Sequence, residues 1–99
     1  MTVVILEDAA EDLEIGAQFY EFCATGVGDY FLDSILSDLD SLVLFAGVHP
    51  TYFGFYRMLS KRFPFGIYYE MEDEMVYVYA ILDLRRDPLW IRERLEKRS

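Results

Sequence analysis

The spacing of apolar residues changes near residue 50 and divides the chain into a helical half and a strand half. Residues 2–6 form a short β-branched run, which is typical of a buried strand. The acidic segment 7–12 favours a helix start, because carboxylates stabilise the positive N-terminal end of a helix. Apolar side chains then recur at the spacing of one helical face: Ala10, Leu13, Ala17 and Tyr20. The first helix is therefore expected to end near Ala24.

Glycine and proline residues mark the ends of a second predicted helix. Gly26 and Gly28 supply the backbone freedom of a tight connection after the first helix. The helical spacing then resumes at Phe31, Ile35, Leu39, Leu42 and Val43. It ends before Gly47 and Pro50, since proline restricts the preceding residue to extended geometry. Two amphipathic helices joined by so few residues are expected to lie antiparallel.

The second half of the chain has the two-residue period of β-strands. Residues 54–60 and 63–71 are each expected to form a strand, and a polar break at 72–74 precedes a third strand at 75–82. The last two strands then form a hairpin. Both alternating sets of the third strand are apolar, with Val76, Val78, Ala80 and Leu82 on one side and Tyr77, Tyr79 and Ile81 on the other. Such a strand is expected to be covered on both faces.

A short C-terminal helix is the expected cover of the second face. Asp87-Pro88 is a typical helix start, with Asp87 as a possible cap. The apolar side chains that could follow on one stripe are Leu89, Trp90, Ile91 and Leu95. We therefore predict a single α+β domain over residues 1–99, with an N-terminal strand, an antiparallel helical hairpin, a three-stranded antiparallel sheet and a short C-terminal helix.

Charge is divided between the same two halves. The chain has 99 residues, of which 18 are acidic and 9 basic, and its net charge is -9. Residues 1–50 contain acidic but no basic side chains, so every lysine and arginine lies in residues 51–99. The net negative field disfavours broad contact with nucleic-acid phosphates and leaves a local basic site in the second half open. The acidic helices are expected to present a solvated face, or alternatively a docking face for a basic partner.

Cysteine, histidine and hydropathy exclude several classes of protein. The single cysteine, Cys23, cannot form an internal disulfide, and its apolar surroundings predict a buried thiol. One His and one Cys predict no transition-metal site, and the chain has no glycine-rich phosphate motif, so no cofactor is expected. His49, before Pro50, is expected to be a loop residue. No signal peptide or long apolar run is present, which predicts a cytoplasmic protein without a membrane association.

An ordered set of residues runs through both halves. In the second half it comprises Gly-Phe-Tyr-Arg-Met-Leu-Ser-Lys-Arg-Phe-Pro-Phe at 54–65, Tyr69, the strand 76–82, and Arg-Arg-Asp-Pro-Leu-Trp at 85–90. In the first half it comprises Asp12-Leu13, Phe19-Tyr20-Glu21, Gly28 and Phe31-Leu32. This order resembles the RelE/ParE superfamily of toxins from bacterial type II toxin-antitoxin systems, and most closely its ParE-like branch. The resemblance covers nearly the whole chain.

The resemblance implies the toxin of a plasmid stabilisation (addiction) system, neutralised by the C-terminal segment of a cognate antitoxin in a hetero-oligomer. Contact with DNA would be indirect, through the antitoxin. ParE-like relatives poison DNA gyrase by protein contact and show no catalysis. RelE-like relatives instead cut ribosome-bound mRNA by attack of a 2'-OH on the adjacent phosphate. A third possibility is a divergent member that binds an antitoxin without being toxic.

The two activities require different residues. RNA cleavage needs cations and a proton carrier, and the candidate cations are Arg57, Lys61, Arg62, Arg85 and Arg86. Many relatives have His where this chain has Asp83, which would be ionised among arginines, and the terminal Tyr of the RNase branch has no counterpart here. These departures and the negative charge favour protein contact. The candidate partner-binding residues are Arg57, Tyr68, Tyr77, Tyr79, Asp83, Arg85, Arg86 and Trp90.

Each candidate also has a purely structural interpretation. Arg57 could pair with Glu70 or Asp83 across neighbouring strands. The tyrosines could be amphipathic packing residues, and the Arg85-Arg86 pair a solvated turn. Phe63 and Phe65 are expected in the core and Pro64 at a strand start, while Trp90 is expected to anchor the last helix on the sheet.

Overall fold

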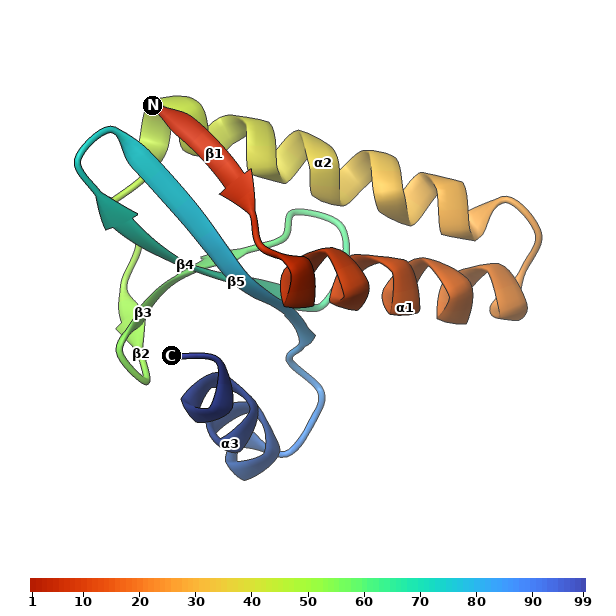
Figure 1. Ribbon diagram of the computed structural model, residues 1–99. Coiled ribbons are helices and arrows are strands. Elements are labelled where there is room, and N and C mark those ends of the chain that lie inside the picture. Colours follow the sequence, from red (N-terminus) through yellow and green to blue (C-terminus); the bar gives the residue numbers. More distant parts are fainter.

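A computed structural model describes residues 1–99 as one five-stranded sheet with a helical hairpin on one face and a short helix on the other (Figure 1). The elements are β1 (Thr2–Ile5), α1 (Glu7–Cys23), α2 (Val27–Phe45), β2 (Thr51–Tyr52), β3 (Phe55–Leu59), β4 (Phe65–Glu72), β5 (Met75–Asp83) and α3 (Pro88–Arg98). The strand order is β1-β5-β4-β3-β2, with β1 parallel to β5 and the other neighbours antiparallel. The predicted α+β class and element order are confirmed, with β1 joining the same sheet and β2 added at its other edge.

The larger core lies between the helical hairpin and the sheet, with Phe31 of α2 at its centre. The Phe31 ring is fully buried and stacks on Tyr20, with its centroid 5.2 Å away, while Phe65 contacts it edge-on at 4.9 Å. α1 approaches this ring through Gly16, where an added Cβ would lie 2.7 Å from Phe31 Cζ. The core-facing stripe of α1 includes Ala9, whereas the predicted Ala10 is exposed. That prediction is wrong because consecutive alanines fit the helical spacing equally well.

A β-bulge at Tyr79 reverses the side of the sheet to which the following side chains of β5 point. Val78 and Ala80 occupy successive register positions opposite β4, which leaves Tyr79 between them without a partner residue. An extra residue reverses the alternation that follows it. Ala80 and Leu82 consequently pack on the α3 side, while Ile81 packs in the hairpin core. The prediction that Ala80 and Leu82 share the face of Val78 is therefore wrong.

The α1–α2 connection is held by the carboxylate of Glu21, which reaches across from α1. It accepts hydrogen bonds from the backbone N–H groups of Gly26, at 3.0 and 3.1 Å, and Gly28, at 3.1 Å. It thereby caps α2, whose N-cap residue Gly26 has no side chain to do so. Gly26 has a φ of 90°, as a glycine connection predicts. Gly28 serves close packing instead, because an added Cβ would lie 2.7 Å from the carbonyl oxygen of Ala17.

The hairpin projects beyond the sheet, so the side chains at its tip are exposed (Figure 1). Cys23 lies at this tip and is exposed, which corrects the prediction of a buried thiol. The prediction assumed that apolar neighbours in the sequence are buried, but the neighbouring Phe22 is itself 92% exposed. None of the helices combines the length and apolar character needed to span a bilayer.

The second face of the sheet is covered by α3, as predicted. Ile91 and Leu95 are buried against Phe55 and Tyr68, together with the β5 residues that the bulge turns to this side. The helix begins at the predicted cap, where Asp87 Oδ1 accepts the backbone N–H of Leu89 at 2.9 Å.

Candidate functional site

A cleft of about 300 Å³ lies between α1 and α3, beside the end of β5. Its apolar lining comes from both helices and the sheet: Ile15, Gly16 and Phe19 of α1, Phe65, Ile81 and Leu82 of β4 and β5, and Trp90 of α3. Its charged lining residues are Asp12, Asp83, Arg86 and Arg94. Of the predicted partner-binding residues, Asp83, Arg86 and Trp90 therefore meet here. Arg94 and the whole α1 wall were not predicted.

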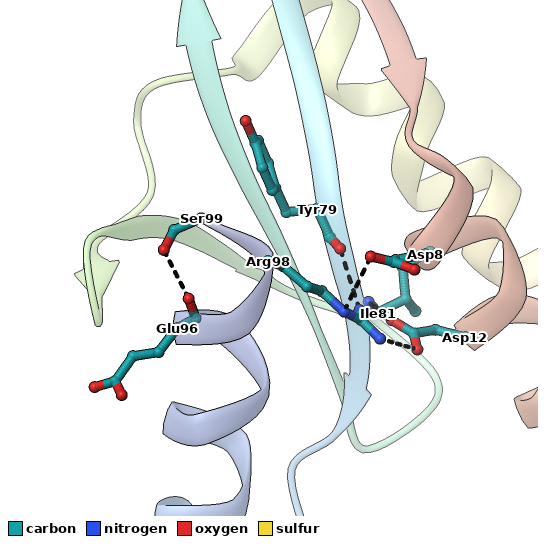
Figure 2. Close-up of polar contacts among 7 residues, drawn as sticks. All are labelled: Asp8, Asp12, Tyr79, Ile81, Glu96, Arg98 and Ser99. Carbon is teal, nitrogen blue, oxygen red and sulfur yellow. Dashed lines mark hydrogen bonds and ion pairs between the residues drawn. The ribbon is translucent and has the colours of Figure 1, made fainter.

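Asp12 of α1, which lines the cleft, forms an ion pair with Arg98 at the end of α3 (Figure 2). Two guanidinium nitrogens of Arg98 donate to the Asp12 carboxylate, at 2.5 and 2.9 Å, and one also donates to the carbonyl oxygen of Tyr79 at 3.2 Å. The carboxylate in turn accepts the backbone N–H of Ile81 at 3.0 Å. Both side chains are only about 10% exposed. The pair thus joins α1, α3 and β5 at one point.

The position of this pair follows from the length of β1. β1 pairs with β5 only as far as Val78, so beyond that residue β5 has β4 on one side and no strand on the other. Asp12 and Arg98 supply the acceptor and donor that this open edge requires. The hydrogen bonds with Asp12 raise the pKa of Arg98, so the guanidinium is charged at any accessible pH. Because the two residues are 86 positions apart, no local pattern in the sequence identifies them as partners.

Asp83 is bound to Arg85 rather than to another strand. Its carboxylate accepts the Arg85 backbone N–H at 2.9 Å and two guanidinium nitrogens at 3.0 and 2.7 Å. The side-chain hydrogen bonds with Arg85 lower the pKa of Asp83. The carboxylate is therefore ionised near neutral pH and cannot donate a proton, in agreement with its predicted state among arginines. The alternative pairing of Asp83 with Arg57 is not formed.

Trp90 is held between two arginines at the α3 wall of the cleft. The guanidinium carbons of Arg86 and Arg94 lie 4.5 and 4.6 Å from the Trp90 ring. Both contacts are in the range of cation–π attraction. Trp90 is half-buried against the core below α3, so it anchors the helix as predicted. Arg94 lies one helical turn after Trp90, which is the only sequence signal that could have identified it.

Two of the remaining candidate cations line a separate hollow of about 550 Å³ near the C-terminal end of α2. Arg57 and Lys61 lie there beside Tyr52 and His49. The Arg57 guanidinium lies 3.7 Å from the centre of the Tyr52 ring, and its buried Nε has no hydrogen-bond partner. Neither predicted pairing, with Glu70 or with Asp83, is formed. Arg62 is exposed outside both hollows.

The three candidate tyrosines differ in accessibility. Tyr68 is 1% exposed in the core below α3, so it has no surface to offer a partner while that helix is in place. Tyr77 and Tyr79 are half-buried, and Tyr79 packs against the ring of Phe55 with centroids 5.1 Å apart. Packing in the core therefore explains Tyr68 fully, and the contact with Phe55 explains the buried part of the Tyr79 side chain.

His49 is fixed by the buried hydroxyl of Tyr69. This hydroxyl accepts the backbone N–H of Gly47 at 2.9 Å and lies 2.5 Å from His49 Nδ1. Because Tyr69 is fully buried, its hydroxyl hydrogen needs an acceptor, and we assign that role to Nδ1. The ring proton is then on Nε2, so His49 presents a donor and not a base to the hollow. His49 thus anchors its loop to the sheet.

The stability of the protein is expected to fall below about pH 6.5 through His49. Burial lowers the pKa of His49 below its ordinary value of 6.5. The unfolded chain therefore binds the proton more readily, and the stabilisation present above pH 6.5 is lost as the pH falls toward the folded-state value. The measurement is urea unfolding from about pH 8 to about pH 5. The variant His49→Asn keeps an acceptor without titrating and should show a shallower decline. Equal declines in both proteins would contradict this assignment.

One solved structure resembles the chain over most of its length. It is a chain of the chromosomal ParDE toxin-antitoxin system from P. aeruginosa, with a TM-score of 0.77 and 17% sequence identity. The superposition covers 85% of the present chain and 96% of that chain. No family model and no curated protein matches the sequence. At this identity the likeness is one of fold, and it confirms the ParE-like fold that the ordered residues imply.

Proposed function

We propose that this protein is the toxin of a type II toxin-antitoxin system, and that it acts in the cytoplasm by protein contact on DNA gyrase. The observation that carries the proposal is the fold likeness to the ParDE system over 85% of the chain. The ordered residues from Asp12 to Trp90 support the same assignment. Neutralisation would come from an antitoxin in a hetero-oligomer, with any DNA contact made by that antitoxin. Such an action needs no cofactor.

The arrangement of titratable groups supports protein contact over RNA cleavage. Arg57 and Lys61 line one hollow and Arg86 another, so the candidate cations are divided between two sites. Asp83 is ionised and bound to Arg85, so it is a poor proton donor, and His49 presents its Nε2 donor and not a base to the hollow of Arg57 and Lys61. The net charge of -9 further opposes binding to ribosomal RNA.

The experiment that tests the proposal is tightly controlled expression of this chain with and without its antitoxin, which is expected to be a small protein encoded by an adjoining gene. Expression alone is expected to arrest growth with intact mRNA, and co-expression is expected to restore growth. Purified protein at about micromolar concentration, a range typical of specific protein contacts, should inhibit supercoiling by gyrase. Normal supercoiling and no trapped cleavage complex would overturn the gyrase assignment. Unimpeded growth without the neighbour would favour a non-toxic member that only binds an antitoxin.

One observation favours RNA cleavage as the second candidate, namely the buried unpaired Nε of Arg57 in its hollow. If the chain is an endoribonuclease, growth arrest should be accompanied by codon-linked cuts in translated mRNA. These cuts should disappear in Arg57→Ala and persist in Arg92→Ala, which changes an exposed arginine of α3 outside both hollows. Arrest without cuts would exclude this candidate.

A further inference from the structure

β2 and β3 form one edge of the sheet, and β2 is too short to cover all of β3 (Figure 1). β2 pairs only with Phe55 and Tyr56, and the carbonyl oxygen of the preceding Pro50 accepts the backbone N–H of Arg57 at 2.9 Å. Proline lacks an N–H group, so Pro50 cannot return a hydrogen bond to the Arg57 carbonyl. Beyond this point, Leu59 has β4 on one side and no strand on the other.

The backbone groups of Leu59 point to this open edge. The N–H of Arg57 points to the β2 side, whereas the N–H of Ser60 points to β4 and donates to the carbonyl oxygen of Phe65 at 2.9 Å. The direction alternates from one residue to the next along an antiparallel strand, so the N–H and C=O groups of Leu59 face outward. Unpaired edge groups of this kind are a template for another extended segment.

The hollow of about 550 Å³ near the end of α2 lies beside this open edge, since Arg57, Met58 and Leu59 all line it. Its most accessible apolar lining residues are Phe45, Val48 and Leu59, which are 55%, 73% and 57% exposed. Exposed apolar side chains gathered around one concavity are typical of a contact site for another molecule. We call the hollow together with the open edge of β3 the β3-edge surface.

The polar lining of the β3-edge surface favours an anionic partner. Arg57 and Lys61 have no carboxylate within 4.0 Å, and the buried Nε of Arg57 has no hydrogen-bond partner. His49 presents its Nε2 donor to the same hollow. The one lining carboxylate, Asp38, is only 4% exposed and already accepts the Ser60 hydroxyl, at 2.8 Å, and the N–H of Lys61. Unpaired donors are thus gathered at one place on a molecule whose net charge is -9.

We propose that the β3-edge surface binds an extended acidic segment of the protein on which the toxin acts. The inference rests on the proposed function, in which the protein acts on a target by contact. The backbone of the segment would pair with Leu59, a carboxylate would bind Arg57 or Lys61, and an apolar side chain would pack against Val48. Complementary charge selects an acidic segment, and the open strand edge selects its extended form.

The β3-edge surface is separate from the cleft between α1 and α3. The two hollows share no lining residue, and β3 lies toward the opposite edge of the sheet from β1. The proposed function requires two protein contacts, one with the antitoxin and one with the target. A target held at the β3 edge therefore leaves the cleft free.

Direct binding is tested with a displayed library of random peptides of about six residues, the usual length of a strand, selected on the full-length protein. Enriched peptides are expected to be acidic, and their binding should weaken about 5- to 10-fold in Lys61→Glu. Hydrogen exchange of the Leu59 amide should slow in the complex, because its N–H gains an acceptor. The matched control Arg92→Glu reverses an exposed arginine outside this hollow and should bind the peptides normally. No enriched peptide, enriched peptides without acidic residues, or equal losses in both variants would overturn the inference.

The identity of the partner is tested by growth. Leu59→Asp places a negative charge on the β3-edge surface and should abolish growth arrest while antitoxin binding is retained. Leu89→Asp is the matched control, since both leucines are 57% exposed and Leu89 lies on α3 outside the hollow. This control should arrest growth like the wild type. Circular dichroism of both variants, and the same growth test on Lys61→Glu, separate a lost contact from a lost fold.

The outcomes distinguish this inference from the proposed function. Full growth arrest by Leu59→Asp and Lys61→Glu would retain the toxin assignment and reject the β3-edge surface as the target contact. Loss of antitoxin binding in these variants would assign the surface to the antitoxin and overturn the inference. So would mRNA cuts that disappear in Lys61→Glu, since they would assign the hollow to RNA. Absence of growth arrest by the wild type would contradict the proposed function, and the peptide selection would still decide whether the surface binds an acidic segment.

Discussion

Replacement of Asp12 by alanine is expected to destabilise the protein by about 3 kcal/mol, a large loss for a residue on a surface helix. The change removes the carboxylate that neutralises the largely buried guanidinium of Arg98 and leaves the N–H of Ile81 without its acceptor. Urea unfolding followed by circular dichroism measures the loss. Trp90, the only tryptophan, lies on α3, so its fluorescence should report early detachment of that helix.

The control for this prediction is Asp8→Ala in the same helix. The Asp8 carboxylate lies 3.8 Å from Arg98 and is 62% exposed, so its loss should cost no more than about 0.5 kcal/mol. Adding Arg98→Met to Asp12→Ala should recover part of the stability, because the uncompensated charge is then gone. An Asp12→Ala protein as stable as Asp8→Ala would show that the pair contributes nothing.

Replacement of Phe31 by alanine is expected to cost about 4 kcal/mol, in the range of buried Phe→Ala changes. Its ring joins α1, α2 and β4 through contacts with Tyr20 and Phe65, and the glycine at position 16 leaves no side chain to fill the cavity. A domain of this size is stabilised by only about 5–15 kcal/mol. The variant should therefore unfold at much lower urea concentration than the wild type.

Phe22→Ala is the matched control for Phe31→Ala. Phe22 is almost fully exposed at the hairpin tip, so its removal should change the free energy of unfolding by less than about 0.5 kcal/mol. Similar losses in the two variants would refute the central role of Phe31 in the core.

The sequence was informative about the fold wherever periodicity was local. The first helix, predicted to end near Ala24, ends at Cys23, and the Asp87 cap is where the motif placed it. The bulge at Tyr79 was not predictable, because both alternating sets of β5 are apolar and a shifted register leaves the pattern unchanged. The pairing of Asp12 with Arg98 was not predictable either, since it depends on how α1 and α3 meet at the open edge of β5.

The candidate site was predicted only in part. Asp83, Arg86 and Trp90 lie within one short segment, so a motif in the sequence brings them together. The α1 wall was missed because α1 has two apolar stripes, and the spacing of Ile15 and Phe19 is as helical as that of the stripe facing the core. Only the packing of the sheet against α1 shows which stripe remains exposed.

The parallel pairing of β1 with β5 also leads to an expected order of events during folding. It joins residues 2–5 to residues 75–78, whereas the α1–α2 hairpin and the β4–β5 hairpin connect neighbours in the chain. Closing the longer loop costs more chain entropy before any contact compensates for it. β1 is therefore expected to dock last, onto preformed hairpins. Until it does, β5 has an unpaired edge along its whole length, and a species with this open edge is expected to be prone to aggregation.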